Sequence, residues 1–84
     1  MTSPVVEVFW RPGCPFCLAL RTGLALRGVR ARWRNIWGDP EAARIVRFHN
    51  QGNETVPTVR IGDTVLTNPS AGTVRRHARR AAAR

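Results

Sequence analysis

The stretch Gly13-Cys14-Pro15-Phe16-Cys17 holds both cysteines of the chain, two positions of sequence between them. An apolar run typical of a strand precedes it and a segment with helical periodicity follows, so it predicts a strand-to-helix junction with two thiols within disulfide reach. A helix start carries unpaired N–H groups and a partial positive charge, which stabilise an anionic sulfur. A redox site is therefore the leading hypothesis.

Length and cysteine content limit the possible classes of protein. The chain has 84 residues and two cysteines, which predicts a single domain over residues 1–84 with one core. A disulfide between Cys14 and Cys17 would close too small a loop to add much stability, so a role in thiol–disulfide exchange is favoured over a structural role. The sequence contains no stretch typical of a signal peptide or a membrane span, so we expect a cytoplasmic monomer that contacts no membrane.

The chain is strongly basic, with a formal net charge of +9. Every basic residue is arginine, whereas surfaces selected for nucleic acid usually also contain lysine. Arginine without lysine, together with abundant alanine, is typical of a GC-rich genome such as that of an actinobacterium. The arginines of residues 75–84 have no aromatic residues between them, which predicts a solvated helix face and no nucleic-acid partner.

Three dipeptides predict helix starts: Cys14-Pro15, Asp39-Pro40 and Asn68-Pro69. The residue before a proline leaves the α region, as an N-cap must, and proline suits the first helical position. The predicted helices cover residues 15–27, 40–50 and 69–83, and Gly28 ends the first.

Helical periodicity predicts which residues face the core. Cys14 is expected at the exposed tip of the first helix, and Cys17, Leu20 and Leu24 on its buried face. The predicted core-facing residues of the other helices are Ala42, Ile45, Val46, His49, Ala71, Val74, Ala78 and Ala81. The arginines expected in solvent are Arg76, Arg79, Arg80 and Arg84. Core and core-rim positions are expected for Trp10, Trp33 and Trp37.

The predicted strands cover residues 5–9, 31–37, 59–61 and 64–66. The last two form a hairpin around the two-residue turn Gly62-Asp63. The first two have a helix between them and should be parallel with a right-handed crossover. The order β-α-β-α-β-β-α predicts an α/β fold with a four-stranded mixed sheet and three helices.

This order, with Cys-Pro-Phe-Cys after the first strand and Thr55-Val56-Pro57 opening the third, resembles the glutaredoxin branch of the thioredoxin fold over essentially the full chain. Within that branch, residues 52–59 (Gly-Asn-Glu-Thr-Val-Pro-Thr-Val) and 66–70 (Leu-Thr-Asn-Pro-Ser) resemble the mycoredoxins. Mycoredoxins are actinobacterial reductases that remove mycothiol from mixed disulfides. The resemblance implies a thiol–disulfide oxidoreductase with no tightly bound cofactor and with a low-molecular-weight thiol as co-substrate.

The candidate catalytic residues are the two cysteines. As an N-cap, Cys14 can accept hydrogen bonds from the N–H groups of Phe16 and Cys17, with Arg11 as a cationic neighbour, so it is the expected nucleophile. Cys17, one turn deeper, is the expected resolving thiol. The partners would be the low-molecular-weight thiol and proteins that carry mixed or internal disulfides.

In the resembling fold, Pro57 is cis and lies against the thiol, while the backbone of Val56 pairs with substrate. The candidate substrate-binding residues are Arg11, Phe16, Thr55, Val56, Pro57, Thr67 and Asn68. Glutaredoxins usually have tyrosine in place of Phe16, and a Gly-Gly segment with an acidic residue in place of residues 67–70. That region normally holds the charged ends of glutathione, so its replacement favours mycothiol, a neutral pseudodisaccharide of cysteine, over glutathione.

Other functions fit parts of the sequence. The Cys pair could serve a dithiol reductase of protein disulfides, or an iron–sulfur carrier in which two protomers and two external thiols ligate one cluster. A zinc site would need two more ligands, and neither His49 nor His77 has ligand spacing, so no metal ion is expected. We expect His49 at the edge of the core. A basic binding module is the remaining alternative.

Overall fold

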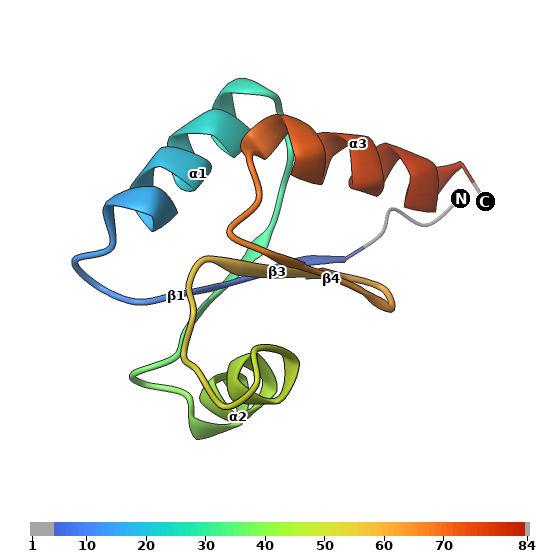
Figure 1. The fold of residues 1–84 in the computed structure, drawn as a ribbon. Coiled ribbons are helices and arrows are strands. Elements are labelled where there is room, and N and C mark those ends of the chain that lie inside the picture. Colours follow the sequence, from blue (N-terminus) through green and yellow to red (C-terminus); the bar gives the residue numbers. More distant parts are fainter. Residues whose placement is uncertain (1–4, 84) are drawn as a thin grey trace.

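The computed structural model describes residues 5–83. The elements are β1 (Val6–Trp10), α1 (Pro15–Leu26), β2 (Arg32–Asn35), α2 (Pro40–His49), β3 (Thr58–Ile61), β4 (Thr64–Thr67) and α3 (Ala71–Ala82). Figure 1 shows three layers, with α1 and α3 on one face of the sheet and α2 on the other. The predicted element order is confirmed.

The sheet has the strand order β2-β1-β3-β4. β1 is parallel to β2, and β3 is antiparallel to β4, as predicted. β1 also pairs with β3 in the antiparallel direction, which joins the two pairs into one sheet. Ile61 pairs with Thr64, which leaves Gly62 and Asp63 as the two-residue turn, and Gly62 has the positive φ of 58° that this turn needs. Because β1 is a central strand, the residues that follow it emerge from the middle of the sheet.

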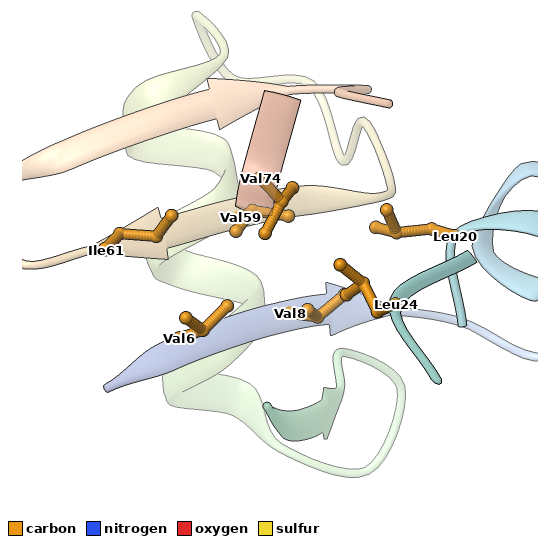
Figure 2. Close-up of a cluster of buried hydrophobic side chains, with 7 residues drawn as sticks. All are labelled: Val6, Val8, Leu20, Leu24, Val59, Ile61 and Val74. Carbon is orange, nitrogen blue, oxygen red and sulfur yellow. The ribbon is translucent and has the colours of Figure 1, made fainter. Parts of the chain in front are cut away.

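The larger core lies between the sheet and helices α1 and α3. Figure 2 shows its side chains pointing toward one another from β1, β3, α1 and α3. They are Val6, Val8, Leu20, Leu24, Val59, Ile61 and Val74. Ala71, Ala78 and Ala81 pack against this cluster, and Cys17 is buried on the same side of α1, as the periodicity predicts.

The second core lies under α2 and consists of Phe9, Ile36, Ala42, Ala43 and Val46. The prediction for the end of this helix was wrong, because His49 is exposed. The buried face follows residues 42, 43, 46 and 50, so the last turn directs its imidazole toward solvent, where it makes an edge-to-face contact with the ring of Phe48.

Two of the three predicted helix starts are confirmed. Cys14 and Asp39 are N-caps followed by proline. The third prediction was wrong, because α3 begins at Ala71 and its N-cap is Ser70, whose hydroxyl accepts the N–H of Thr73 at 3.2 Å. Asn68 has a φ of 49°, which is a left-handed turn conformation and not the extended one of an N-cap.

The end of α1 is closed by glycine, as predicted. Gly28 has a φ of 68°, its N–H donates to the carbonyl of Ala25 at 3.1 Å, and the next N–H, of Val29, donates to Leu24 at 3.0 Å. These two bonds form a Schellman motif, which satisfies the carbonyls at the helix end.

Trp37 is 64% exposed, contrary to the prediction of a core position, whereas Trp10 and Trp33 are half-buried. β2 ends at Asn35, whose side-chain oxygen accepts the N–H of Trp37 at 2.9 Å and turns the chain away from the sheet. Arg76, Arg79 and Arg80 are exposed as predicted, and Arg84 lies outside the described residues.

An ionic network covers part of the sheet on the α2 side. The carboxylate of Glu7 accepts from Arg60 at 2.8 Å and from Arg34 at 3.3 Å, and Arg34 also binds Asp39 at 2.9 Å. Burial raises the pKa of the Glu7 carboxyl, but the hydrogen bonds and charges of the two arginines outweigh it and hold this pKa below its usual value. No helix within residues 5–83 combines the length and apolar character needed to cross a membrane.

A candidate active site at the start of helix α1

The turn between β1 and α1 places Cys14 at the first helical turn. Gly13 has a φ of 79°, a conformation that glycine adopts at little cost. Cys14 itself is extended, and its sulfur accepts the N–H of Cys17 at 3.2 Å. Of the two N–H groups predicted to reach this sulfur, only that of Cys17 does so among the described residues. The sulfur therefore lies at the positive end of the helix dipole.

Both cysteines are free and buried, with residue exposures of 8% for Cys14 and 4% for Cys17. The prediction that Cys14 forms an exposed tip was therefore wrong. A loop 42 positions later in the sequence lies beside it, and the Cys14 thiol donates to the carbonyl of Val56 at 3.9 Å. The thiol still forms part of the wall of a surface cleft.

The thiol of Cys17 is held in its protonated form. Burial raises its pKa to about 11, and its side-chain hydrogen bond with Cys14 acts in the same direction. A backbone hydrogen bond and the positive charge of Arg11 act in the opposite direction and only partly offset the increase. Cys17 is consequently a neutral thiol at neutral pH.

The loop before β3 provides the other side of the site. The Val56–Pro57 bond is cis, as the resemblance implies, and Pro57 is buried. The carbonyl of Pro57 accepts the N–H of Asn68 at 2.8 Å, which joins this loop to the segment before α3. Val56 and Pro57 thus lie on the loop beside Cys14, and Asn68 is joined to that loop.

Asn50, at the end of α2, was missed in the sequence analysis, and its side chain connects the loop before β3 to the end of β4. Its side-chain NH₂ donates to the carbonyl of Val46 at 2.8 Å and to the hydroxyl of Thr58 at 3.3 Å. Its side-chain oxygen accepts from the Thr67 hydroxyl at 2.8 Å, and the Thr58 hydroxyl donates to the carbonyl of Thr55 at 2.6 Å. The carbonyl of Thr55 and the hydroxyl of Thr67 therefore form hydrogen bonds within the protein. A polar residue four positions after core-facing Val46 was the available signal.

A first cleft lies between α1 and the segment before α3. It has a volume of ≈ 350 Å³, and Phe16 and Asn68 line it. Its other lining residues are Ala19, Leu20, Pro69, Ser70 and Ala71, so no charged side chain borders it. Phe16 is 64% exposed at its edge. We call this the Phe16–Asn68 cleft.

A second cleft, of ≈ 550 Å³, lies on the other side of α1, toward β2. Its lining residues are Trp10, Arg11, Gly13, Cys14, Pro15, Cys17, Leu18, Arg21 and Trp33. Arg11 is thus separated from the other predicted binding residues. The sequence offered a signal for Arg21, which follows Cys17 by one helical turn, but Trp33 joins the cleft only through the pairing of β2 with β1. We call this the Trp10–Trp33 cleft.

Within residues 5–83, no group of three or more His, Cys, Asp or Glu side chains is placed to hold a metal ion.

Comparison with known proteins gives consistent matches. The family model described as Glutaredoxin matches residues 6–66. The chain is 36% identical over 76 residues to "Putative glutaredoxin Rv3198A" of Mycobacterium tuberculosis, covering 89% of this chain and 90% of the relative. It is 39% identical over 70 residues to Mycoredoxin 1 of Corynebacterium glutamicum, covering 82% and 86%.

A solved structure is also similar. NrdH-redoxin from Escherichia coli, described as a glutaredoxin-like protein, superposes with a TM-score of 0.72 at 26% identity, covering 86% of this chain and 92% of that one. The four-stranded mixed sheet and three helices found here are those of the thioredoxin-like glutaredoxin fold. The chain belongs to the glutaredoxin family of thiol–disulfide oxidoreductases.

Proposed function

We propose that this glutaredoxin reduces mixed disulfides between proteins and a low-molecular-weight thiol, and that it uses mycothiol in preference to glutathione. The observation that carries the proposal is the bond from the Cys17 N–H to the Cys14 sulfur at 3.2 Å. An N–H donor at a helix start stabilises a thiolate, which is the form that attacks and leaves in disulfide exchange. Cys14 is therefore the proposed nucleophile.

In the proposed reaction the Cys14 thiolate attacks the mycothiol sulfur of the mixed disulfide. A bond forms between these two sulfurs, and the protein thiolate leaves with the electron pair and takes a proton from solvent. A second mycothiol, as its thiolate, then attacks the same mycothiol sulfur, and Cys14 leaves as a thiolate. The incoming mycothiol and the mycothiol carried by the substrate thus become one disulfide, and the protein sulfur is left as a thiol.

The Phe16–Asn68 cleft is the proposed place for the low-molecular-weight thiol. Its lining has no charged side chain, which suits a neutral sugar thiol better than glutathione with its charged ends. In this proposal the backbone of Val56 pairs with the peptide-like part of the thiol, and Pro57, which has no N–H, leaves the thiolate without a competing donor. The similarity to Mycoredoxin 1 supports the same choice of thiol.

Reduction of protein disulfides through both cysteines is the second candidate function. It is favoured by the position of Cys17 one turn below Cys14, and by the similarity to NrdH-redoxin, whose structure is described as the basis of a thioredoxin-like activity profile. Here Cys17 would attack the sulfur of Cys14 in the mixed disulfide and release the reduced protein. The proposed setting for either reaction is the cytoplasm, with the protein acting as a single-domain monomer.

Turnover assays with mycothiol, glutathione and a thioredoxin-type regeneration system test both functions in parallel. We expect the fastest reduction of a mixed disulfide with mycothiol, and none with Cys14→Ser. Cys17→Ser should keep much of the mycothiol-dependent activity but lose reduction of protein disulfides, because only an external thiol can then resolve the intermediate. Equal loss of both activities in Cys17→Ser would contradict this division of roles.

A further inference from the structure

The charges of the protein are unevenly compensated. Four of the five carboxylate side chains form ion pairs, and they use only Arg34, Arg47 and Arg60. The four carboxylates belong to Glu7, Asp39, Glu41 and Glu54. The arginines of α1 and α3 form no ion pair within residues 5–83; they are Arg21, Arg75, Arg76, Arg79 and Arg80. Figure 1 shows these two helices on the same face of the sheet, so this face carries five positive charges that no carboxylate of the described residues pairs with.

The Trp10–Trp33 cleft opens on this positive side. Its volume of ≈ 550 Å³ lies within the range of pockets that hold ligands. Two tryptophans and a leucine form much of its wall, and Arg11 and Arg21 are its charged residues; no carboxylate borders it. The lining therefore combines an apolar surface with an uncompensated positive charge.

The positive charge has a defined position at the edge of the cleft. The guanidinium carbon of Arg21 lies 5.2 Å from the centre of the Trp33 ring, a distance at which cation and ring attract each other. Arg21 is exposed and forms no ion pair within the described residues, so it is available to an acidic group of a ligand. Leu18, 66% exposed, adds apolar surface on the same helix.

We propose that the Trp10–Trp33 cleft is the docking site for an acidic segment of the protein substrate. An apolar side chain next to the substrate cysteine would enter the cleft, and Arg11 and Arg21 would attract a neighbouring carboxylate. The inference rests on the proposed function, in which Cys14 attacks a protein-borne disulfide, because Cys14 is part of the cleft wall. The substrate's two halves then lie on opposite sides of α1, with the low-molecular-weight thiol in the uncharged Phe16–Asn68 cleft.

Short peptides test this docking site without a need for the natural thiol. Each peptide has one cysteine in a mixed disulfide with thionitrobenzoate, and the flanking residues are leucine and glutamate, leucine and lysine, or serine and glutamate. Thionitrobenzoate is the better leaving group, so Cys14 attacks the peptide sulfur, as it would attack a protein sulfur in the second candidate function. The reaction releases coloured thionitrobenzoate, and the second-order rate constant is measured. We expect the leucine–glutamate peptide to react about three- to tenfold faster than either of the others, with the charge preference falling at high salt.

Variants of the cleft residues test whether Arg21 and Leu18 cause the preference for the leucine–glutamate peptide. Arg21→Glu should reverse the preference between glutamate and lysine, and Arg21→Gln should reduce it. Leu18→Ser should reduce the preference for leucine over serine. The matched controls are Arg44→Glu, an exposed arginine on α2 across the sheet, and Leu26→Ser, an exposed leucine of α1 away from the cleft, and both should leave the preferences unchanged.

The possible failures are distinguishable. If none of the peptides releases thionitrobenzoate in a Cys14-dependent reaction, the proposed function fails. If all three peptides react at the same rate, or if Arg44→Glu alters the charge preference as much as Arg21→Glu does, the docking site is overturned while the proposed function stands.

Discussion

The Thr67 hydroxyl donates a hydrogen bond to the side-chain oxygen of Asn50 at 2.8 Å, and this contact joins the end of β4 to the end of α2. The same asparagine is only 6% exposed and also binds Thr58, the residue that follows Pro57. One side chain thus ties the end of β4 to the loop whose Val56 carbonyl accepts from the Cys14 thiol. Loss of that side chain should therefore affect the site as well as the stability.

Asn50→Ala is expected to lower the free energy of unfolding by about 1–3 kcal/mol, because the buried Thr58 hydroxyl and the Val46 carbonyl lose a partner. It should also lower kcat/KM for mixed disulfides at temperatures where the variant remains folded. Thr67→Val is the milder comparison, because it removes only the bond to the side-chain oxygen. An Asn50→Ala enzyme with unchanged kcat/KM would show that this network supports only stability.

The contact between α1 and α3 depends on Gly23. A Cβ at this position would lie 2.6 Å from the Cβ of Ala71, too close without a shift of one helix. In Gly23→Ala the steric clash should lower the free energy of unfolding by about 1–3 kcal/mol. The better helix propensity of alanine should offset about 0.5–1 kcal/mol of this loss. Gly72→Ala is the matched control, since a Cβ there meets no atom within 4 Å.

Thermal and denaturant unfolding measure both variants. Gly72→Ala should be neutral or slightly more stable than the parent, because alanine is the better helix former. If both substitutions change stability in the same direction and by the same amount, close packing of the two helices is not the cause.

The sequence predicted correctly the features that depend on neighbouring residues, and it failed where residues far apart in the sequence interact. Cys14-Pro15 and Asp39-Pro40 start helices through local geometry and were predicted correctly. Asn68-Pro69 has the same local pattern, but the N–H of Asn68 is bound to the carbonyl of Pro57, and Ser70 caps the helix. The competing bond comes from a distant loop, which helix-start rules do not consider.

In the candidate site, too, local features were predicted and long-range contacts were not. The thiol pair and its position at a helix start follow from five adjacent residues. The burial of Cys14 depends on Val56, and the second cleft depends on the pairing that brings Trp33 beside α1. Such long-range placements follow from the assembled sheet and are not visible in sequence spacing.

Acid should destabilise the protein through Glu7 and Asp39. The Arg34 side chain, with help from the N–H of Ala42, holds the pKa of Asp39 below its usual value, and Arg60 and Arg34 overcome burial to lower that of Glu7. The unfolded chain then binds protons more readily than the folded one. The resulting stability is present above the ordinary carboxyl range and is lost as pH falls through the lower pKa values of the folded state.

Unfolding free energies measured from neutral pH down to about pH 3 test this expectation. Glu7→Gln should be less stable than the parent near neutral pH and should lose less stability on acidification. Asp63→Asn is the control, because Asp63 is exposed and forms no ion pair within residues 5–83. If the Glu7→Gln protein loses as much unfolding free energy on acidification as the parent does, other carboxyl groups cause that loss.

The raised pKa of Cys17 predicts how the internal resolving step depends on pH. With a pKa of about 11, only about one Cys17 in ten thousand is a thiolate at pH 7. In the mixed disulfide the Cys14 thiol no longer contributes to this pKa, but burial remains its largest cause. The rate at which Cys17 releases a peptide from Cys14 should therefore rise steadily, up to about tenfold per pH unit, through the neutral and mildly alkaline range.

Stopped-flow release of a peptide from the purified Cys14 mixed disulfide measures this rate without added thiol. Resolution by an external thiol in the Cys17→Ser protein is the comparison, and its rate should level off near the ordinary thiol pKa of about 8.5. The two profiles should separate above that pH, because only the buried thiol continues to gain thiolate. An internal rate that is constant from about pH 6 to 9 would mean that Cys17 is already ionised in the intermediate, and that burial does not control its reactivity.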